Sequence, residues 1–408
     1  MAVRQTGAVS FERQVSVAEH RAAIQRLVGG PVARRVALDR HALGRRLAAD
    51  LVAADDLPRF DNSAMDGYAV HPSSAEQREF VVVGDVPAGL APFFELGRGE
   101  AARVMTGARL PIGTSAVVPV EHTDATPTGP APKRVVISVG VHAGRHLRRR
   151  GEDVAAGTTI ATSGSVVTPA LIALGRSAGC AQALVCAAVR VAVVATGAEL
   201  VDPSREPGLG SIHESNSDMV AALALSAGCV AAPVLTCDDE PERLRAVLDD
   251  LVTSGAVDLV ITTGGVSAGA YEVVRQVCEP LASFEFRHLA MQPGGPQGLG
   301  RWRSLPVVCL PGTPGGAFVA FQMLVRPALD ARHGAPPAVA RTATFHGGPR
   351  SMRAGRMQFL TSVLHDDGTV TLPHGRHLAA LAAANALVEV PAEVETLVEG
   401  DVVRVHPL

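Results

Sequence analysis

The stretch VRVAVVATG, residues 189–197, decides the fold class: it is apolar except for Arg190 and ends in Thr196 and Gly197. A short apolar run that stops at a glycine is typical of a strand buried on both faces of a sheet. Three similar runs follow, and a helical pattern comes after each. The expected strands are 189–197, 229–236, 257–265 and 305–312, and the expected helices are 215–228, 240–255, 271–281 and 315–334. We therefore expect a doubly wound, parallel α/β domain over residues 188–333.

The bulk composition excludes several classes of protein. A chain of 408 residues is long enough for two to four domains. Hydrophobic residues make up 47% but aromatic residues only 3%, so small aliphatic side chains must fill the cores. A net charge of -3 gives no basic field, so we expect no nucleic-acid partner. No apolar segment is of membrane-spanning quality, and no Cys-x-x-Cys pair occurs, which favours a cytoplasmic protein with buried, reduced thiols.

The remaining segments have different patterns. Apolar spacing predicts helices over residues 17–28 and 42–54, and short β-like runs separated by Gly and Pro occupy residues 58–141. Residues 168–179 resemble a short helix. After Pro336 the chain returns to strands and turns, with HDDGTV at residues 365–370 as a hairpin turn. A small C-terminal β barrel or sandwich is expected.

Ligands of an open parallel sheet bind beyond the carboxyl ends of its strands. Four such ends carry polar residues, in ATGAEL, LTCDDE, ITTGGVSAG and LPGTP. The glycines of TTGGVSAG allow close approach of the backbone, and the following helix start favours anions such as phosphate. The ordinary alternative is a tight turn without a ligand.

Acids beside a phosphate site require a cation between them. Glu199, Asp239 and Glu272 follow three of the expected strands, so they suggest a Mg²⁺ ion shared with phosphate oxygens. Each acid has a simpler interpretation as a helix-start residue stabilised by the helix dipole. Both interpretations stay open from the residues alone.

Two polar stretches precede the sheet. FDNSAMDGYAV, residues 60–70, has the composition of a turn with two carboxylates, Asp61 and Asp66. RHLRRRGED, residues 145–153, holds four arginines and two acids. An exposed charged turn is the ordinary interpretation of this stretch, and a phosphate-binding patch completed by Asp153 is the functional one.

Several stretches occur in the order typical of one family. They are FDNSAMDGYAV, RVMTGA, RRRGEDV, ATGAEL, SNSDMV, TTGGVSAG and LPGTP. Together they resemble the molybdopterin molybdenumtransferases of the MoeA type, which are related to the gephyrin E domain, over about residues 12–408. The resemblance implies an α/β multidomain protein: a molybdopterin-binding doubly wound domain, an elongated two-segment domain with an inserted β domain, and a C-terminal β barrel. The expected boundaries are 12–57 with 142–187 for the elongated domain, 58–141 for the insert, 188–333 for the α/β domain and 334–408 for the C-terminal domain.

The resemblance also implies an activity. Adenylylated molybdopterin is cleaved, AMP leaves and molybdate is inserted, with Mg²⁺ assisting. Members form homodimers whose active sites lie at the subunit interface. The molybdopterin adenylyltransferase and molybdoenzyme apoproteins are the implied protein partners.

The same resemblance assigns site residues. Catalytic roles fall on Asp61, Thr106, Asp153 and Glu199; metal binding on Glu199, Asp239 and Glu272; and cofactor binding on Gly264, Gly265, Ser267, Gly269, Pro311, Gly312, Pro314 and Arg150. Asp61 would position metal, water or molybdate, with its turn reaching the α/β domain of the other subunit. Thr106 would donate to a phosphate, whereas Asp66 and Asn62 would hold the turn through Asx hydrogen bonds.

The sequence departs from the family at the expected ligand edge. Gln292 and Gly295 stand where the family shows two lysines, in Lys-Pro-Gly-Lys-Pro. Ala270, Tyr271 and Glu272 replace Asp-Tyr-Asp, and LPGTPGGA replaces a motif with Asn-Pro-Val-Ser. The loss of two cations from an anion site removes strong, charge-assisted contacts.

Three hypotheses follow. The first is an active molybdenum insertase. The second is a divergent paralogue that binds pterin as a carrier or scaffold in molybdoenzyme assembly, which the missing lysines favour. The third is a different phosphoanhydride or nucleotide hydrolase, which leaves FDNSAMDGYAV unexplained.

Overall fold

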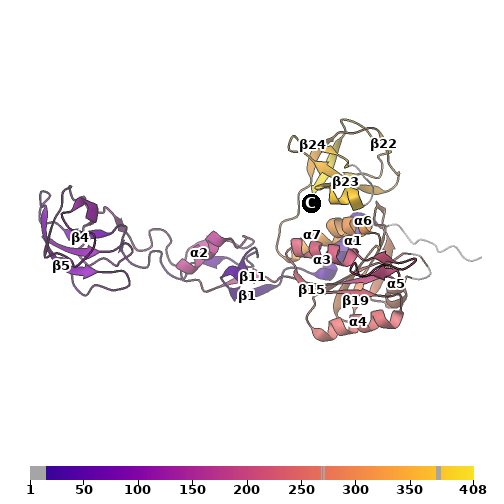
Figure 1. The fold of residues 1–408 in the computed structure, drawn as a ribbon, viewed down its shortest axis with the longest axis horizontal. Helices are drawn as coiled ribbons and strands as arrows, with labels where there is room; N and C mark the ends of the chain where they lie inside the picture. The colour runs from indigo at the N-terminus through magenta and orange to yellow at the C-terminus, as the bar shows by residue number, and fades with distance from the viewer. Residues whose placement is uncertain (1–14, 268, 270–271, 374–377) are drawn as a thin grey trace, which may run out of the picture. The chain divides into compact units, whose positions relative to one another are not determined.

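A computed structural model of the chain describes residues 15–267, 269, 272–373 and 378–408 (Figure 1). Backbone contacts divide the chain into two compact units. Unit 1 comprises the residues up to 34, 44–48 and 185–408, and unit 2 comprises 35–43 and 49–184. The four-part division expected from the sequence stays a prediction, and its residues 12–14 lie outside the described part of the chain.

A six-stranded sheet forms the centre of unit 1, in the order β15-β12-β16-β20-β19-β17. The first four strands pair in parallel, whereas β19 and β17 continue the sheet antiparallel. The bounds are β12 (Arg190–Thr196), β15 (Val230–Cys237), β16 (Leu259–Thr263), β17 (Phe284–His288), β19 (Pro296–Trp302) and β20 (Leu305–Leu310). The four parallel strands are those expected from the sequence. The pattern did not reveal β19, because its proline and glycines are depleted in strands.

Helices cover both faces of this sheet, as Figure 1 shows for α4 on one side and α3 and α7 on the other. Val193, Ile261 and Val308 pack in one core cluster with α1, α3 and α6. The alternate residues of the same strands pack in a second cluster with α4 and α5. Burial on both faces is why these strands are continuously apolar in sequence. The helices are α1 (Val17–Val28), α3 (Asn216–Ser226), α4 (Pro241–Ser254), α5 (Val273–Cys278) and α6 (Pro314–Ala320), which continues through a π-helical turn, η3 (Phe321–Val325), into α7 (Arg326–Arg332).

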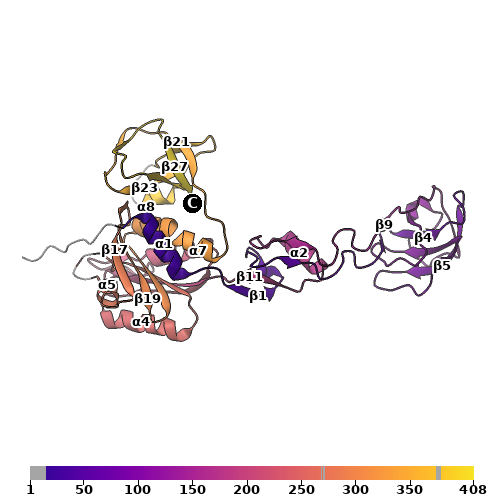
Figure 2. The same ribbon diagram turned by 180° about the vertical axis from the view of Figure 1, so that it is seen from behind.

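Helix α1 belongs to unit 1 and lies against α7 (Figure 2). A capping box starts it, since the Ser16 side chain accepts from the Glu19 backbone and the Glu19 side chain accepts from the Ser16 backbone. Arg21 Nε donates to the Met323 carbonyl at 2.8 Å. Backbone contacts thus place this segment in unit 1 together with the six-stranded sheet.

A closed five-stranded barrel ends the chain. The strands pair in the order β23-β24-β21-β27-β25, and β25 returns to β23. They are β21 (Arg341–Phe345), β23 (Met357–Leu364), β24 (Thr369–Thr371), β25 (Ala386–Val390) and β27 (Val402–Pro407), accompanied by β18 (Met291–Gln292), β22 (Arg350–Ser351), β26 (Thr396–Leu397) and α8 (Leu378–Ala382). The predicted C-terminal barrel and the hairpin turn between β23 and β24 are confirmed.

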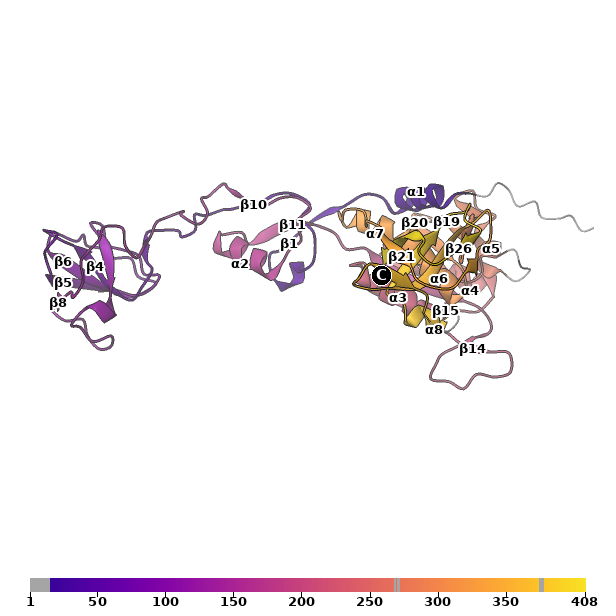
Figure 3. The same cartoon turned by 90° about the horizontal axis from the view of Figure 1, so that it is seen from above.

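Unit 2 contains a five-stranded sheet (Figure 3), whose strands pair in the order β7-β4-β6-β5-β8. Tyr68 and Phe80 are fully buried in its core. These strands are β4 (Gly67–His71), β5 (Glu79–Val86), β6 (Glu100–Val104), β7 (Ala116–Pro119) and β8 (Arg134–Val136). Shorter elements are η1 (Arg40–Ala42), β2 (Leu51–Val52), β3 (Asn62–Ser63), η2 (Val120–His122), β9 (Leu147–Arg148), β10 (Thr159–Ala161) and α2 (Pro169–Ser177). β1 (Ala33–Ala37) pairs with β11 (Gln182–Cys186).

The helix predicted over residues 42–54 is wrong. A single 3₁₀ turn ends at Ala42, and Gly44 has a positive φ of 76°. Farther along, β2 pairs with β10, and the Ala53 N–H donates to the Thr158 carbonyl at 2.9 Å. Pairing with residues distant in sequence overrode the local apolar spacing.

All six cysteines are free and buried, as the sequence predicted. No helix in the described part of the chain combines the length and the apolar character that crossing a membrane requires.

Candidate functional site

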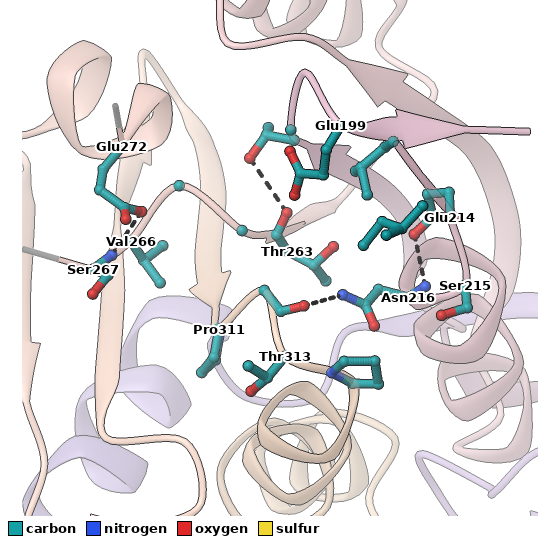
Figure 4. Close-up of a pocket in the computed structure, with 18 of the residues that line it drawn as sticks. Glu199, Glu214, Ser215, Asn216, Thr263, Val266, Ser267, Glu272, Pro311 and Thr313 are labelled. Atoms are coloured by element: carbon teal, nitrogen blue, oxygen red, sulfur yellow. Dashed lines mark hydrogen bonds between the residues drawn. The ribbon is translucent and has the colours of Figure 1, made fainter. Parts of the chain in front are cut away.

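The carboxyl ends of the parallel strands lie level with one another. Ala195 pairs with Thr263, and Thr263 pairs with Leu310, so the loops that follow β12, β16 and β20 leave the sheet at the same edge. These loops line a cavity of about 640 Å³, here called the sheet-edge pocket (Figure 4). Its lining includes the predicted residues Glu199, Asp239, Gly264, Gly265, Ser267, Glu272, Pro311, Gly312 and Pro314. Gly269 is not part of the lining.

Glycines let two of these loops touch. Gly264 has φ of 90°, and a Cβ there would lie 2.5 Å from the Thr196 carbonyl oxygen. A Cβ on Gly312 would lie 3.2 Å from the Gly264 Cα. A side chain at Gly264 would therefore be strained and would clash with the Thr196 backbone.

The pocket is acidic. Four carboxylates line it, from Glu199, Glu214, Asp239 and Glu272, and no lysine or arginine does so among its described lining residues. Asp239 Oδ2 accepts the Ala198 N–H at 3.0 Å, and Glu272 Oε2 accepts the Ser267 N–H at 2.9 Å. The first bond joins Asp239 to the loop after β12, and the second lies within the loop between β16 and α5; Glu199 is exposed at the edge (Figure 4).

Sequence reasoning missed Glu214. Its side chain is buried, and Oε1 accepts the N–H groups of Asn216 at 2.6 Å and Ser217 at 2.9 Å. It therefore caps α3, whereas the Ser215 side chain makes no capping bond. β14 (Ile212–His213), which pairs with β13 (Leu200–Val201), leads directly to this acid. An acid just before a helical pattern was the available signal.

Asn216 was also missed. Its Nδ2 donates to the Gly312 carbonyl at 2.6 Å, which connects the start of α3 to the last loop of the pocket. Its Oδ1, like the Thr263 hydroxyl, is buried without a hydrogen-bond partner. An unpaired buried acceptor is costly unless a ligand donor satisfies it.

The acids suit a metal that is only partly held by protein. Among the described residues, no three His, Cys, Asp or Glu side chains form a group that could hold a metal ion. Mg²⁺ commonly keeps several waters and takes one or two carboxylates together with substrate phosphates. Glu199, Asp239 and Glu272 all line the pocket, so they offer the one or two carboxylates that this mode of binding needs.

The two positions of the missing lysines are not in the pocket lining. Gln292 lies in β18 with its Oε1 buried and unpartnered. Gly295 is buried, and a Cβ there would lie 2.9 Å from His288 Nε2. Their neighbours Gly294 and Pro296 do line the pocket. Ala270 and Tyr271 lie outside the described residues.

The stretch FDNSAMDGYAV, residues 60–70, is here called the polar turn; it lies in unit 2 and includes β3 and the first residues of β4. β3 pairs with β9, so Asn62 faces Arg148 and the turn meets the arginine run. Asp61 Oδ2 lies 2.6 Å from Arg149 Nη1, and Oδ1 accepts the Arg150 N–H at 2.8 Å. The Arg150 N–H and then the Arg149 guanidinium hold the pKa of Asp61 below its ordinary value.

Asp66 does not form the predicted Asx bond. Its Oδ1 instead accepts from the backbone N–H of Thr106 at 2.6 Å and from the Thr106 hydroxyl at 2.8 Å. These bonds lower the pKa of Asp66. Ser63 holds the turn locally, through the Met65 backbone N–H at 3.3 Å. The hydroxyl of Thr106, the predicted phosphate donor, thus donates its hydrogen bond to Asp66 within this subunit.

A second cavity of about 670 Å³ adjoins Asp61. We call it the arginine cavity; its wall includes Arg59, Phe60, Asp61, Arg109, Arg149 and Arg150. Asp153 lines a separate hollow with Leu57 and Arg148, and its N–H donates to the Leu57 carbonyl at 3.0 Å.

Three family models match the chain. They are the MoeA N-terminal region (domains I and II) over residues 15–179, a probable molybdopterin binding domain over 192–331, and the MoeA C-terminal region (domain IV) over 353–408.

Two relatives and one solved structure extend the comparison. Molybdopterin molybdenumtransferase 2 of Mycobacterium tuberculosis is 41% identical over 90% of this chain and 93% of its own length. Molybdopterin molybdenumtransferase 1 of the same organism is 32% identical over 96% and 98%. The molybdopterin biosynthesis MoeA protein from Pyrococcus horikosii superposes with a TM-score of 0.78 at 27% identity, covering 97% of this chain and 99% of that one.

Proposed function

Because the chain belongs to the MoeA family of molybdopterin molybdenumtransferases, we propose that it inserts molybdate into adenylylated molybdopterin and releases AMP. The family is one of transferases in molybdenum cofactor biosynthesis. The observation that carries the finer proposal is the sheet-edge pocket, in which glycine loops, buried unpaired polar atoms and carboxylates meet.

The pocket would hold the pterin phosphate. Ser267 and Thr263 line it, and the Thr263 hydroxyl has no hydrogen-bond partner; hydroxyls can donate to phosphate oxygens. The unpaired Asn216 Oδ1 would accept an N–H of the ligand, while its Nδ2 keeps the Pro311–Pro314 loop in place through Gly312. The Glu214 carboxylate accepts the backbone N–H of Asn216, which fixes the position of Asn216.

The negative charge of the sheet-edge pocket indicates that the reaction needs a cation. A phosphorylated ligand is repelled by four carboxylates unless a cation lies between them. Glu199, Asp239 and Glu272 would hold Mg²⁺, which when bound neutralises the phosphoanhydride and stabilises its leaving oxygen. Glu199, exposed at the edge, is the acid best able to meet both the metal and the ligand.

The polar turn would complete the site from the partner subunit of a homodimer. Asp61 would position water or molybdate against the phosphoanhydride, and Thr106 would hold Asp66 and the shape of the turn. Arg150 and Asp153 would lie at the same interface. A cytoplasmic enzyme of this kind would receive its substrate from the molybdopterin adenylyltransferase and pass the product to molybdoenzyme apoproteins.

A second candidate function is a pterin-binding paralogue without turnover. The specific observation in its favour is that no lysine or arginine is present among the described residues lining the pocket.

One assay separates the two functions. Purified protein is given adenylylated molybdopterin, molybdate and Mg²⁺, and AMP release is followed, while calorimetry measures binding of the adenylylated ligand. AMP release that depends on molybdate supports the insertase. Tight binding of adenylylated molybdopterin with no AMP release at saturation would refute the insertase and support the pterin-binding paralogue.

A further inference from the structure

A small cavity in unit 2 is lined by three histidines and one arginine. We call it the histidine cavity; its charged or ionisable lining residues are His122, His142, Arg145 and His146. No aspartate or glutamate is among the described residues that line it. Its volume is about 130 Å³, well below the roughly 300–1,000 Å³ of sites for drug-sized ligands. The cavity therefore has room for an inorganic ion and not for a pterin or a nucleotide.

Backbone hydrogen bonds hold the segments that carry these side chains. The Arg145 N–H donates to the His142 carbonyl at 3.2 Å, and the Arg145 carbonyl accepts the N–H of Val117 in β7 at 3.0 Å. The His122 carbonyl accepts the Ser138 N–H at 2.9 Å and the Ser138 hydroxyl at 3.0 Å. The segments around the cavity are thus fixed to one another without a ligand.

His146 has a backbone conformation that glycine would adopt more readily. Its φ is 57°, in the left-handed region. Its carbonyl accepts the N–H of Ala64, in the polar turn, at 3.0 Å. The next residue, Leu147 of β9, pairs with Ser63 of β3. A ligand that bound the His146 ring would therefore stabilise the backbone that supports the polar turn.

The four polar side chains of the cavity have donors available. Within the described part of the chain, no hydrogen bond or ion pair involves their ring nitrogens or guanidinium group. A neutral imidazole donates one N–H and a protonated one donates two, and a guanidinium donates five. The remaining wall is largely apolar, with the buried Val118 and the partly buried Val139. Apolar surroundings strengthen a charge-assisted hydrogen bond.

This lining favours an anion over a metal ion. Imidazoles commonly bind Zn²⁺ or Cu²⁺, but no three His, Cys, Asp or Glu side chains of the described residues form a group that could hold a metal. A guanidinium has no acceptor and cannot ligate a cation, whereas its planar fork matches phosphate oxygens. A tetrahedral oxyanion has four acceptor oxygens. It can therefore contact imidazoles that lie too far apart to ligate one metal ion.

We propose that the histidine cavity binds a tetrahedral oxyanion of the phosphate and sulfate class, with the Arg145 guanidinium and the rings of His122, His142 and His146 as donors. None of the described residues that line it also lines the sheet-edge pocket or the arginine cavity. The bound ion would connect the segments around the cavity and so stabilise the folded state. The proposal does not depend on the proposed function.

Histidine NMR on the full chain, with isotope-labelled ring carbons, tests the assignment. Sodium sulfate and sodium phosphate are the titrants, and sodium chloride at matched ionic strength is the control for screening. Signals are identified from the His122→Gln, His142→Gln and His146→Gln variants. We expect the three cavity signals to shift at millimolar oxyanion with a common Kd. The signal of His41, an exposed histidine of unit 2 outside the cavity lining, should stay unchanged.

Substitution of the arginine tests its role as the charged donor. Arg145→Ala should weaken sulfate binding about tenfold, and Arg145→Lys by less, because a charge without the planar fork is retained. Arg98→Ala, at an exposed arginine of unit 2 outside the cavity lining, is the matched control and should bind sulfate like the wild type. Thermal unfolding checks that each variant is folded. If Arg145→Ala is not, His142→Gln replaces it, with an expected loss of about threefold.

Three results would overturn the assignment: no shift of the cavity histidine signals at tens of millimolar sulfate and phosphate, equal shifts in sodium chloride, or unchanged sulfate affinity in the folded donor variant. Binding of sulfate alone or of phosphate alone supports the site and identifies the oxyanion that it prefers. AMP release from adenylylated molybdopterin plays no part in this test, so the proposed function and the histidine cavity can fail separately.

Discussion

The sheet-edge pocket and the arginine cavity are of similar volume, about 640 and 670 Å³, but they carry opposite charge. Four carboxylates and no basic side chain except His213 line the first among its described residues, whereas four arginines and one carboxylate line the second. An anionic ligand is attracted by the second region alone. The first region can hold the same ligand only with a cation, so the two regions should respond differently to metal and to charge changes.

The largest expected difference follows removal of divalent cations. EDTA should lower AMP release about 100-fold or more, because four carboxylates then face the ligand phosphates without a counter-charge. Readdition of Mg²⁺ is the control. An unchanged rate of AMP release in EDTA would show that the sheet-edge pocket does not need a divalent cation.

Removal of one pocket carboxylate should have the next largest effect. Glu199→Gln should lower kcat/KM for adenylylated molybdopterin about 10- to 100-fold and raise the Mg²⁺ concentration needed for half-maximal rate. Glu206→Gln, an exposed glutamate nearby in sequence that does not line the pocket, is the matched control. The metal role of Glu199 is refuted if the dependence on Mg²⁺ is the same in both variants.

Asn216→Ala tests the connection between α3 and the last pocket loop. The loss of the bond to Gly312 should cost about 1–2 kcal/mol of unfolding free energy and raise KM about tenfold, because the loop loses its anchor. Asn385→Ala is the control: Asn385 bonds the backbone of Leu364 in the C-terminal barrel at 2.7 and 3.0 Å. The Asn385→Ala variant should lose a similar amount of unfolding free energy and keep the wild-type KM. Equal KM values in the Asn216→Ala and Asn385→Ala variants would exclude a positioning role for Asn216.

The smallest expected effect is on the free energy of unfolding and concerns Asp66 of unit 2. Hydrogen bonds lower the pKa of Asp66, chiefly from the Thr106 N–H. A lowered pKa stabilises the fold above the ordinary value of about 3.9, and this stability is lost as pH falls through the lower folded value.

Because Asp66 is exposed, Asp66→Asn should cost no more than about 1 kcal/mol at pH 7. Urea unfolding of the two proteins at pH 7, 5 and 3 should show this difference shrinking toward pH 3. A difference that widens on acidification would contradict the assigned role of these hydrogen bonds.

The sequence predicted the sheet-edge pocket better than any other feature, and the reason is geometric. Once four strands are parallel, their carboxyl ends and the glycine loops behind them must share an edge, so Glu199, Gly264 and Gly312 fall together. The strong apolar runs made those strands recognisable without any knowledge of tertiary contacts.

Features that depend on distant contacts were not predictable in this way. Asn216 reaches Gly312 across 96 positions, and Thr106 reaches Asp66 across 40. The arginine cavity needs the pairing of β3 with β9 and the bridge from Asn62 to Arg109, neither of which leaves a local pattern. The wrong helix over residues 42–54 has the same cause, since distant strand pairing outweighed local spacing.

The central claim is that a sheet-edge pocket from one subunit and a polar turn from its partner act on one ligand. The most direct test is a heterodimer, purified through two different tags, of a Glu199→Gln chain and an Asp61→Ala chain. Each homodimer should release AMP at no more than about a tenth of the wild-type rate. The heterodimer contains one site with both halves intact if the sites form between subunits, so it should recover about half of the wild-type rate of AMP release. A heterodimer as slow as the two homodimers would contradict the claim.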